Sequence, residues 1–228
     1  MTERTRELFT CLETYLQSRI PGSRLEKTQL AQAPELSLYL INEDYPRNGL
    51  TREQAEALMD NPPYWGFCWA SGQVLGQCVL DNPDWVKGKT VVDFGAGSGV
   101  VGIAAKMAGA RRVILCDLDE KALQAGELNA RMNGVNVGFS AAIEDLLKED
   151  VSDWIIMVAD VFYDRDNLPL LETLLDRFAT VLASDSRLKG QPLPGMDIIG
   201  DFDSHTVPDL DESREFNSVA LYRSRQNR

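Results

Sequence analysis

The sequence predicts a parallel, doubly wound α/β sheet in a chain of 228 residues. Apolar, strand-like runs alternate with helical patterns from residue 89 onwards, as they do in chains of β-α-β units. The first of these runs ends in a glycine-rich turn, and the fourth is apolar throughout, as expected of a strand buried on both faces. With 44% hydrophobic and 25% charged residues, the composition is that of a globular protein rather than a disordered or fibrous one.

An N-terminal extension precedes the alternating part of the chain. Apolar residues recur about every four positions over residues 1–20, which predicts an amphipathic helix. A polar connector follows, and then the apolar run 36–41, which is compatible with either a strand or a helix. Residues 51–59 also have a helical pattern, which two prolines end. We therefore expect an extension over residues 1–62 that packs on a core domain over residues 63–228.

The core domain is expected to alternate between strands and helices. Strands are predicted over residues 91–94, 112–117, 137–141 and 154–159, and helices over residues 100–108 and 119–133 and along the apolar face from Leu170 to Val181. Gly109 and Gly134 follow the first two helices, where a glycine commonly ends a helix. Because parallel strands need a crossover between them, this order indicates parallel pairing.

The turn after the first predicted strand carries the strongest local signal. Residues 93–99 read Asp-Phe-Gly-Ala-Gly-Ser-Gly, and a predicted helix follows directly. Glycines let a ligand approach the backbone, and a helix N-terminus offers free N–H groups. Residues 97–102 also match the G-x-G-x-x-G pattern of dinucleotide-binding folds, so NAD and S-adenosylmethionine (SAM) must both be weighed.

Three features bear on the choice of cofactor. The Asp93 carboxylate, near the end of the strand, would repel a pyrophosphate but would favour the sulfonium and ammonium groups of SAM. The turn begins at Gly95, so the literal G-x-G-x-x-G match starts one glycine too late. Asp117, which ends the next strand 22 residues after Gly95, suits a ribose hydroxyl of either cofactor. We therefore predict SAM, with NAD and a turn without a ligand as the alternatives.

Further carboxylates follow the third and fourth predicted strands. Glu144 and Asp145 could accept a hydrogen bond from an adenine amino group or could cap a helix. Asp160 follows an apolar strand, at the sheet edge where open α/β folds bind ligands, so we expect it to be functional. The chain has one histidine, His205, and four cysteines without a CxxC pair, so we expect free thiols and no metal site.

Charge and hydropathy limit the partners of the chain. The net charge is -12 and no run of Lys or Arg could follow a phosphate backbone, so we expect no nucleic-acid partner. The sequence has no window of 18 uninterrupted apolar residues, which predicts no membrane span. The N-terminus matches neither a signal peptide nor a transit peptide, and the expected location is the cytoplasm.

Several stretches resemble a known family. These are Pro-Glu-Leu-Ser-Leu at 34–38, Pro-Tyr-Trp-Gly-Phe-Cys-Trp-Ala-Ser-Gly-Gln at 63–73, the glycine turn, and Asp-Val-Phe-Tyr-Asp at 160–164. Their order resembles the class I SAM-dependent methyltransferases, and most of all the lysine methyltransferases that act on the β subunit of electron transfer flavoprotein. The resemblance implies a Rossmann-like, mostly parallel seven-stranded sheet with helices on both faces and an N-terminal helical extension.

The resemblance also implies roles for individual residues. Trp69 would flank the methionine end of SAM, Gly95, Ala96 and Gly97 would line its amino-acid part, Asp117 would hold the ribose, Ile143 and Asp145 would border the adenine, and Ala159 would end the fourth strand beside the cofactor. Asp160 and Tyr163 match the motif that faces the substrate lysine and would be catalytic. Residues 185–187, Asp-Ser-Arg, resemble the Asp-Pro-x-Arg turn that follows the fifth strand in this family.

The resulting prediction is a SAM-dependent protein-lysine N-methyltransferase whose substrate is the β subunit of electron transfer flavoprotein. Methyl transfer from a sulfonium requires close alignment and little acid–base machinery, which a chain with one histidine can provide. A small-molecule N-methyltransferase acting on a pyridine or an amine is the alternative enzyme. A SAM-binding module without catalysis is the alternative of a different class.

Overall fold

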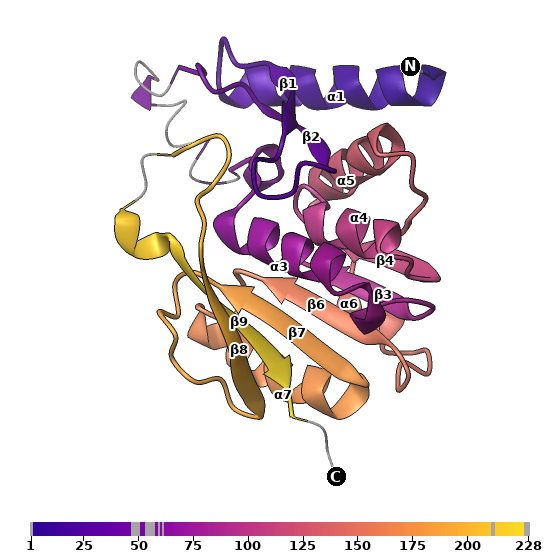
Figure 1. Cartoon of the computed structure of the whole chain (residues 1–228). Coiled ribbons are helices and arrows are strands. Elements are labelled where there is room, and N and C mark those ends of the chain that lie inside the picture. Colours follow the sequence, from indigo (N-terminus) through magenta and orange to yellow (C-terminus); the bar gives the residue numbers. More distant parts are fainter. Residues whose placement is uncertain are drawn as a thin grey trace.

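A seven-stranded sheet forms the centre of the computed structural model (Figure 1). The structure describes residues 2–46, 51, 52, 58, 60, 62–210 and 213–225. Five parallel strands lie in the order β5-β4-β3-β6-β7, and the antiparallel strands β9 and β8 complete the sheet. Their bounds are β3 Thr90–Phe94, β4 Arg112–Cys116, β5 Gly138–Ser140, β6 Ile155–Ala159, β7 Thr180–Asp185, β8 Met196–Asp203 and β9 Ser218–Ser224. The mostly parallel seven-stranded sheet is therefore confirmed.

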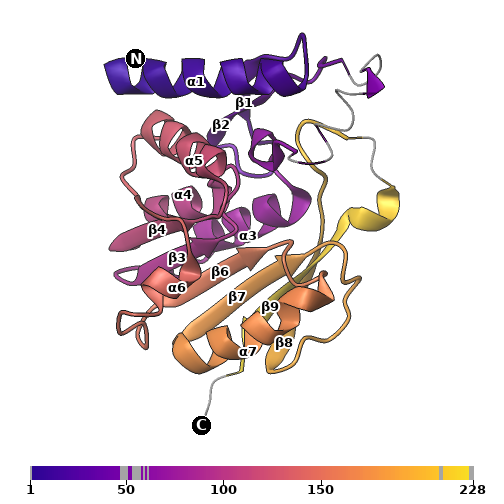
Figure 2. The same ribbon diagram turned by 180° about the vertical axis from the view of Figure 1, so that it is seen from behind.

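Helices cover both faces of this sheet. One face carries α3 (Ala70–Asp81), α4 (Val100–Met107) and α5 (Glu120–Met132), and the view from behind shows α6 (Ile143–Leu146) and α7 (Leu168–Arg177) on the other (Figure 2). The central strand β6 is buried on both faces because helices pack above and below it. Its Ile156 side chain faces one apolar cluster and its Met157 side chain faces the other. The alternation of strands and helices predicted from residue 89 onwards is therefore confirmed.

The structure corrects the boundary of the last predicted helix. Helix α7 ends at Arg177, and Phe178 follows as its C-cap in an extended conformation. Val181, which the helical pattern included, lies in β7 and is fully buried. The apolar side chains of the helix face and of the strand belong to one cluster, so a periodicity of apolar residues alone does not show where one element ends and the next begins.

Several elements had no predicted range, namely α6, β7, β8 and β9 and two elements of the N-terminal half. Strand β1 (Leu25–Gln29) lies in the polar connector and pairs antiparallel with β2 (Ser37–Ile41), which the sequence left open between strand and helix. Helix α3 follows the aromatic stretch and packs on α4. Of the predicted helix over residues 51–59, only residues 51, 52 and 58 are described, so most of it lies outside the described residues.

The N-terminal helix α1 (Glu3–Arg19) packs on α5, as Figure 1 shows at the top of the molecule. Leu8, Leu12 and Leu16 are buried in one apolar cluster with Ala125 and Leu128 of α5. Full burial of a leucine side chain contributes about 1.5–3 kcal/mol, so this interface has a substantial apolar driving force. The predicted helix and its apolar face are confirmed, while the division of the chain at residue 62 stays a prediction.

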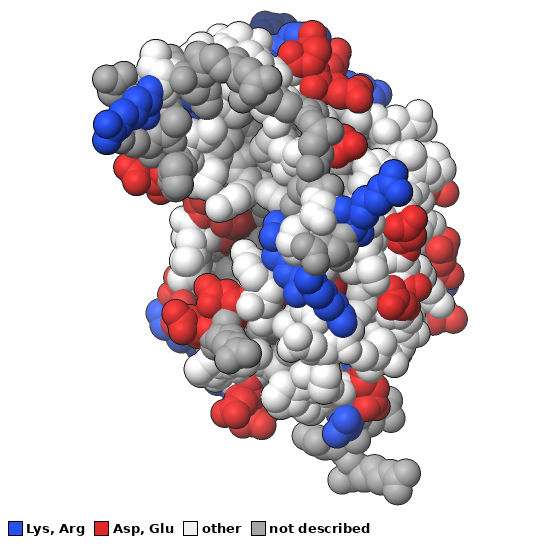
Figure 3. Space-filling model, turned by 90° about the vertical axis from the view of Figure 1, so that its left-hand side faces the viewer, with Lys and Arg blue, Asp and Glu red and all other residues white. Residues whose placement is uncertain are grey.

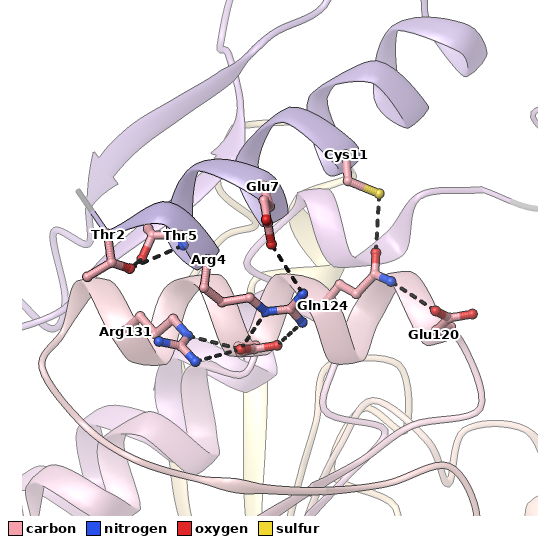
Figure 4. A network of polar contacts seen from close by, with 9 residues as sticks. Thr2, Arg4, Thr5, Glu7, Cys11, Glu120, Gln124 and Arg131 are labelled. Carbon is pink, nitrogen blue, oxygen red and sulfur yellow. Dashed lines mark hydrogen bonds and ion pairs between the residues drawn. The ribbon is translucent and has the colours of Figure 1, made fainter.

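Polar contacts also hold the extension on α5. The Arg4 guanidinium donates to both carboxylate oxygens of Glu127, at 3.1 and 2.7 Å, and Arg131 donates to Glu127 as well (Figure 4). Further along, the fully buried Asn129 of α5 accepts a hydrogen bond from the Tyr39 backbone amide at 2.7 Å. Because a buried asparagine is costly without partners, this contact ties strand β2 to one position on α5.

No helix among the described residues is both long enough and apolar enough to cross a membrane.

Candidate functional site

A cavity of about 450 Å³ lies beyond the carboxyl ends of β3, β4 and β6, where open α/β sheets bind ligands. Its size falls within the usual range for small-molecule sites. Figure 3 views the molecule from the side toward which the arrow of β6 points in Figure 1, and the surface is hollowed there. The lining residues are Tyr64, Trp65, Trp69, Gly95, Gly97, Asp117, Asp119, Ala122, Ala159, Asp160, Val161, Tyr163 and Arg187.

The glycine turn lies at the base of this cavity. Gly95, Gly97 and Gly99 have φ angles of 70°, 52° and 79°, in the left-handed region that side chains other than glycine rarely adopt. A Cβ atom on Gly97 would come no closer than 3.9 Å to the rest of the protein. The protein therefore leaves free space beside Gly97, which fits a bound ligand that lies against the backbone.

Asp117 joins the end of β4 to the glycine turn. Its Oδ2 accepts a hydrogen bond from the Gly97 amide at 2.9 Å, and its Oδ1 accepts one from the Asp119 amide at 2.9 Å. Partial burial raises the pKa of this carboxyl group, while the two amide hydrogen bonds oppose the shift. A carboxylate offers about four acceptor sites, so Asp117 can still receive ribose hydroxyls.

Asp93 does not have the position that the argument for SAM assumed. It is buried in β3, outside the cavity lining, and its Oδ2 accepts a hydrogen bond from the Gly102 amide in α4 at 2.7 Å. Burial raises the pKa of this carboxyl group to about 7. The interpretation that Asp93 faces a sulfonium is therefore wrong, because the strand turns this side chain under the helix rather than toward the ligand.

Gly102, which completes the literal G-x-G-x-x-G match, has a packing role instead. A Cβ atom there would overlap the Leu115 side chain of β4 and would lie 3.1 Å from Asp93 Oδ2. Glycine at this position lets α4 pack closely on the sheet. The two halves of the pattern therefore serve different purposes, since Gly97 borders the cavity and Gly102 lies in the helix–sheet interface.

Asp160 lies at the cavity with an unusual backbone. Its φ angle is 52°, which aspartate tolerates better than most residues. Its Oδ1 accepts hydrogen bonds from Ser71 Oγ at 2.7 Å and from the Ser186 amide and hydroxyl at 3.2 and 3.1 Å. All hydrogen bonds between this carboxylate and the described residues fall on Oδ1. Burial raises the pKa of Asp160, and these donors oppose the shift.

Ser71 and Ser186 were not predicted as site residues. Ser71 lies in the first turn of α3, and Ser186 follows β7, so 115 positions of the sequence separate them. Both side chains are buried. The Ser184 hydroxyl also donates to the Ser71 carbonyl at 2.9 Å, which positions the start of α3 on the end of β7. Ser71 and Ser186 both lie in stretches that resemble the family, at 63–73 and 185–187, but only the sheet topology brings these two stretches together.

Tyr163 lies at the mouth of the cavity and is 48% exposed. The Arg187 guanidinium lies over its ring, 5.4 Å from the centroid, and 4.8 Å from the ring centroid of Phe216. The Tyr163 amide donates to Asp185 Oδ2 at 3.2 Å, and Asp185 Oδ1 accepts from the Arg187 and Leu188 amides at 2.8 Å each. Asp185 therefore holds two loops of the cavity mouth together, and burial raises its pKa to about 6.

Three further aromatic side chains, those of Tyr64, Trp65 and Trp69, also line the cavity. Trp69 donates from Nε1 to the Tyr64 carbonyl at 3.1 Å, and their ring centroids lie 5.8 Å apart. Trp65 is almost fully buried, and its Nε1 has no hydrogen-bond acceptor among the described residues. Phe67 is also buried but does not line the cavity, so it belongs to the apolar cluster under the N-terminal extension.

The cavity brings together most of the predicted site residues but not all. Trp69, Gly95, Gly97, Asp117, Ala159, Asp160 and Tyr163 line it. Ala96 is a buried residue of the turn, Ile143 is buried at the start of α6, and Asp145 is exposed and pairs with Lys148 at 2.7 Å. Neither Glu144 nor Asp145 is the N-cap of α6, because Ala142 occupies that position.

The charge of the lining suits a cationic ligand. Among the described residues, the lining contains three carboxylates and one guanidinium, those of Asp117, Asp119 and Asp160 and that of Arg187. Such a surface would repel a pyrophosphate and would attract sulfonium and ammonium groups. This argument favours SAM over NAD without the contribution that Asp93 was expected to make.

Comparisons with known proteins show similarity to methyltransferases. The family model for ribosomal protein L11 methyltransferases matches residues 78–182. The electron transfer flavoprotein β-subunit lysine methyltransferase of Homo sapiens is 36% identical over 67% of this chain and 59% of its own length. The corresponding protein of Mus musculus is 32% identical over 76% of this chain and 67% of its own length.

The chain thus spans only part of several of these relatives, 59% of the human protein and 62% of the one from Rattus norvegicus. Among solved structures, a chain provisionally described as a SAM-dependent methyltransferase from Streptococcus mutans matches with a TM-score of 0.52 at 12% identity. That alignment covers 67% of this chain and 48% of the other. At such low identity the structural likeness shows a shared fold.

Proposed function

The chain belongs to the class I SAM-dependent methyltransferases, in the family of the electron transfer flavoprotein β-subunit lysine methyltransferases, and on this basis we propose that it methylates lysine side chains of a protein. We further propose that the β subunit of electron transfer flavoprotein is its substrate. The observation that carries the proposal is the position of Asp160 and Tyr163 at one cavity with the glycine turn. The names of the relatives support the identity of the substrate.

The residues at the mouth of the cavity suit an amine acceptor. SAM supplies, when bound, an electrophilic methyl group on a sulfonium. A free lysine has a pKa of about 10.4, so its deprotonation at pH 7 costs about 5 kcal/mol. Asp160 would attract the ammonium group, orient the nitrogen and accept its proton directly or through water. Tyr163 would position the aliphatic part of the lysine and limit the access of water.

The remaining cofactor contacts follow from the family. Gly95 and Gly97 would lie against the amino-acid part of SAM, Asp117 would bind the ribose, and Trp69 would flank the methionine end. For Ala96, Ile143 and Asp145, which do not line the cavity, contact with the cofactor stays a prediction. The cytoplasmic location is likewise a prediction from the sequence.

A labelling experiment tests the proposed function. The purified chain is incubated with tritium-labelled SAM and either purified electron transfer flavoprotein or a cell lysate. Label on the β subunit, lost when its lysines are acetylated beforehand, is the expected result. Label in the small-molecule fraction alone would favour the alternative of a small-molecule N-methyltransferase. Binding of S-adenosylhomocysteine without any label would favour a SAM-binding module.

A further inference from the structure

A second cavity lies between the N-terminal ribbon and the segment that follows β8. It has a volume of about 410 Å³, and four consecutive residues of β1, from Glu26 to Gln29, line it on one side. His205, Val207, Pro208 and Asp209 line the other side. Successive side chains of a strand point to opposite faces. Four consecutive lining residues therefore indicate that this groove follows the edge of β1, and Ile41 and Glu43 show that part of it also borders the end of β2 and the segment after it.

The hydrogen-bond pattern of the ribbon shows which backbone groups face the groove. At its two ends, the Asn42 amide donates to the Arg24 carbonyl at 3.0 Å, and the Leu30 amide donates to the Leu36 carbonyl at 3.1 Å. Hydrogen-bonded positions alternate in an antiparallel pair, so the residues of β1 with even numbers face β2. The amides and carbonyls of Lys27 and Gln29 therefore point away from β2, toward the groove.

Nothing in the described part of the chain satisfies these outward groups. The neighbouring outward amide, that of Leu25, donates to Glu13 Oε1 of α1 at 3.1 Å, whereas the backbone groups of Lys27 and Gln29 have no protein partner among the described residues. An open strand edge of this kind is a template for pairing with another extended segment. The outer edge of β1 is thus covered by α1 at Leu25, while its backbone groups at Lys27 and Gln29 are available for pairing along the groove.

The groove is adjacent to the catalytic cavity. At one end of it, Gln32 is hydrogen-bonded to the Asp203 carbonyl at 2.8 Å and to the Ser204 hydroxyl at 2.6 Å, which fixes the turn of the ribbon. Val207 pairs with Cys68 through two backbone hydrogen bonds of 2.7 and 2.8 Å. The next residue, Trp69, lines the catalytic cavity, so a single stretch of chain separates the two cavities.

We propose that this groove binds an extended, basic segment of the protein substrate as an additional strand along Lys27 and Gln29. The proposal rests on the proposed function, since it concerns how a protein substrate is held. The groove lining has three carboxylates, those of Glu26, Glu43 and Asp209, with one lysine and one histidine, and Arg24 contacts Glu26 at 3.8 Å, so a small acidic excess favours basic side chains. Pairing through main-chain hydrogen bonds would hold a substrate lysine beside the catalytic cavity without requiring specific side chains at most of the flanking positions.

A proline substitution tests the pairing. Lys27→Pro removes one outward amide and leaves the β1–β2 hydrogen bonds intact, as prolines on strand edges do. The KM for electron transfer flavoprotein should rise about tenfold, the effect of one lost hydrogen bond, while kcat and the affinity for S-adenosylhomocysteine stay unchanged. Lys27→Ala, which removes the same charge and keeps the amide, is the matched control and should leave the KM unchanged or lower it. A wild-type KM in the proline variant, or an equal rise in both variants, would overturn the proposal.

A charge variant and a peptide probe complete the test. The double variant Glu26→Gln and Glu43→Gln leaves the backbone unchanged and should also raise the KM severalfold at low salt. It tests the groove independently if Lys27→Pro fails to fold. If the wild type leaves electron transfer flavoprotein unlabelled, the proposed substrate fails, and the groove is tested separately with a labelled peptide of alternating valine and lysine. Anisotropy should show binding that Lys27→Pro weakens, and an absence of binding to wild type would refute the docking site.

Discussion

Replacing Asp160 by asparagine separates its chemistry from its structural role. Asparagine tolerates the left-handed φ of 52° about as well as aspartate does. Its side-chain oxygen can accept the same hydrogen bonds from Ser71 and Ser186 that Oδ1 accepts now. The substitution therefore changes the charge and leaves the backbone and the packing in place.

The expected effect is a large loss of rate without a loss of stability. A general base contributes about 10²–10⁴-fold, which corresponds to about 3–5 kcal/mol of activation free energy. Burial raises the pKa of Asp160, so its charged form destabilises the folded state at pH values above that pKa. The Asp160→Asn variant should therefore be at least as stable as wild type at pH 8, and its affinity for S-adenosylhomocysteine should change by only a few fold.

The assay measures tritium transfer to electron transfer flavoprotein across a pH series, together with thermal unfolding and calorimetry. Ser71→Ala is the matched control, because it keeps the carboxylate and removes one donor from Oδ1. Losing a donor to the charged form raises the pKa of Asp160 further, so the acid limb of kcat/KM should move to higher pH. A transfer rate near that of wild type in the asparagine variant, with unchanged thermal stability, would show that Asp160 is structural.

Other perturbations test the cofactor site, the core and the extension. Asp117→Ala should weaken S-adenosylhomocysteine binding about 10- to 100-fold, as expected for a charged hydrogen bond, and unchanged affinity in calorimetry would contradict the ribose site. Burial raises the pKa of Asp93 from 3.8 to about 7, so the folded state keeps a proton on this carboxyl group where the unfolded state has lost it, and the unfolding free energy of wild type should fall as the pH rises from 3.8 to about 7. In urea unfolding at a series of pH values, Asp93→Asn should lack this fall. The same pH dependence in both proteins would contradict the protonated state of Asp93. Leu12→Ala should cost about 2–5 kcal/mol of unfolding free energy, and a loss below about 1 kcal/mol would show that α1 is loosely packed.

The sequence was informative where local chemistry decides local structure. The runs that became β3, β4 and β6 are apolar because both faces of these strands are buried, and this composition is visible without the fold. The glycines of the turn have positive φ angles, which few other residues adopt. Asp160 could be singled out because an apolar strand must end at the ligand edge of the sheet.

Strand β1 could not be predicted, because its sequence, Leu-Glu-Lys-Thr-Gln, has no alternation of apolar and polar residues. It forms a strand because β2 pairs with it, and β2 is in turn tied to Asn129 and Asn133 of α5. These partners lie about 90 positions away in the sequence. Tertiary contacts thus decided the conformation of a segment whose own preference is weak.

The sequence by itself determined the alternation of strands and helices from residue 89 onwards, the glycine turn and the positions of the carboxylates along the chain. Only the tertiary structure decided which carboxylates face the ligand. Asp93 lies one residue before the end of β3 and Asp117 directly follows β4, yet the first is held under α4 by the Gly102 amide and the second lines the cavity. The direction of a side chain depends on strand pleat and helix packing, and the donors that orient Asp160 come from segments that only the sheet brings together.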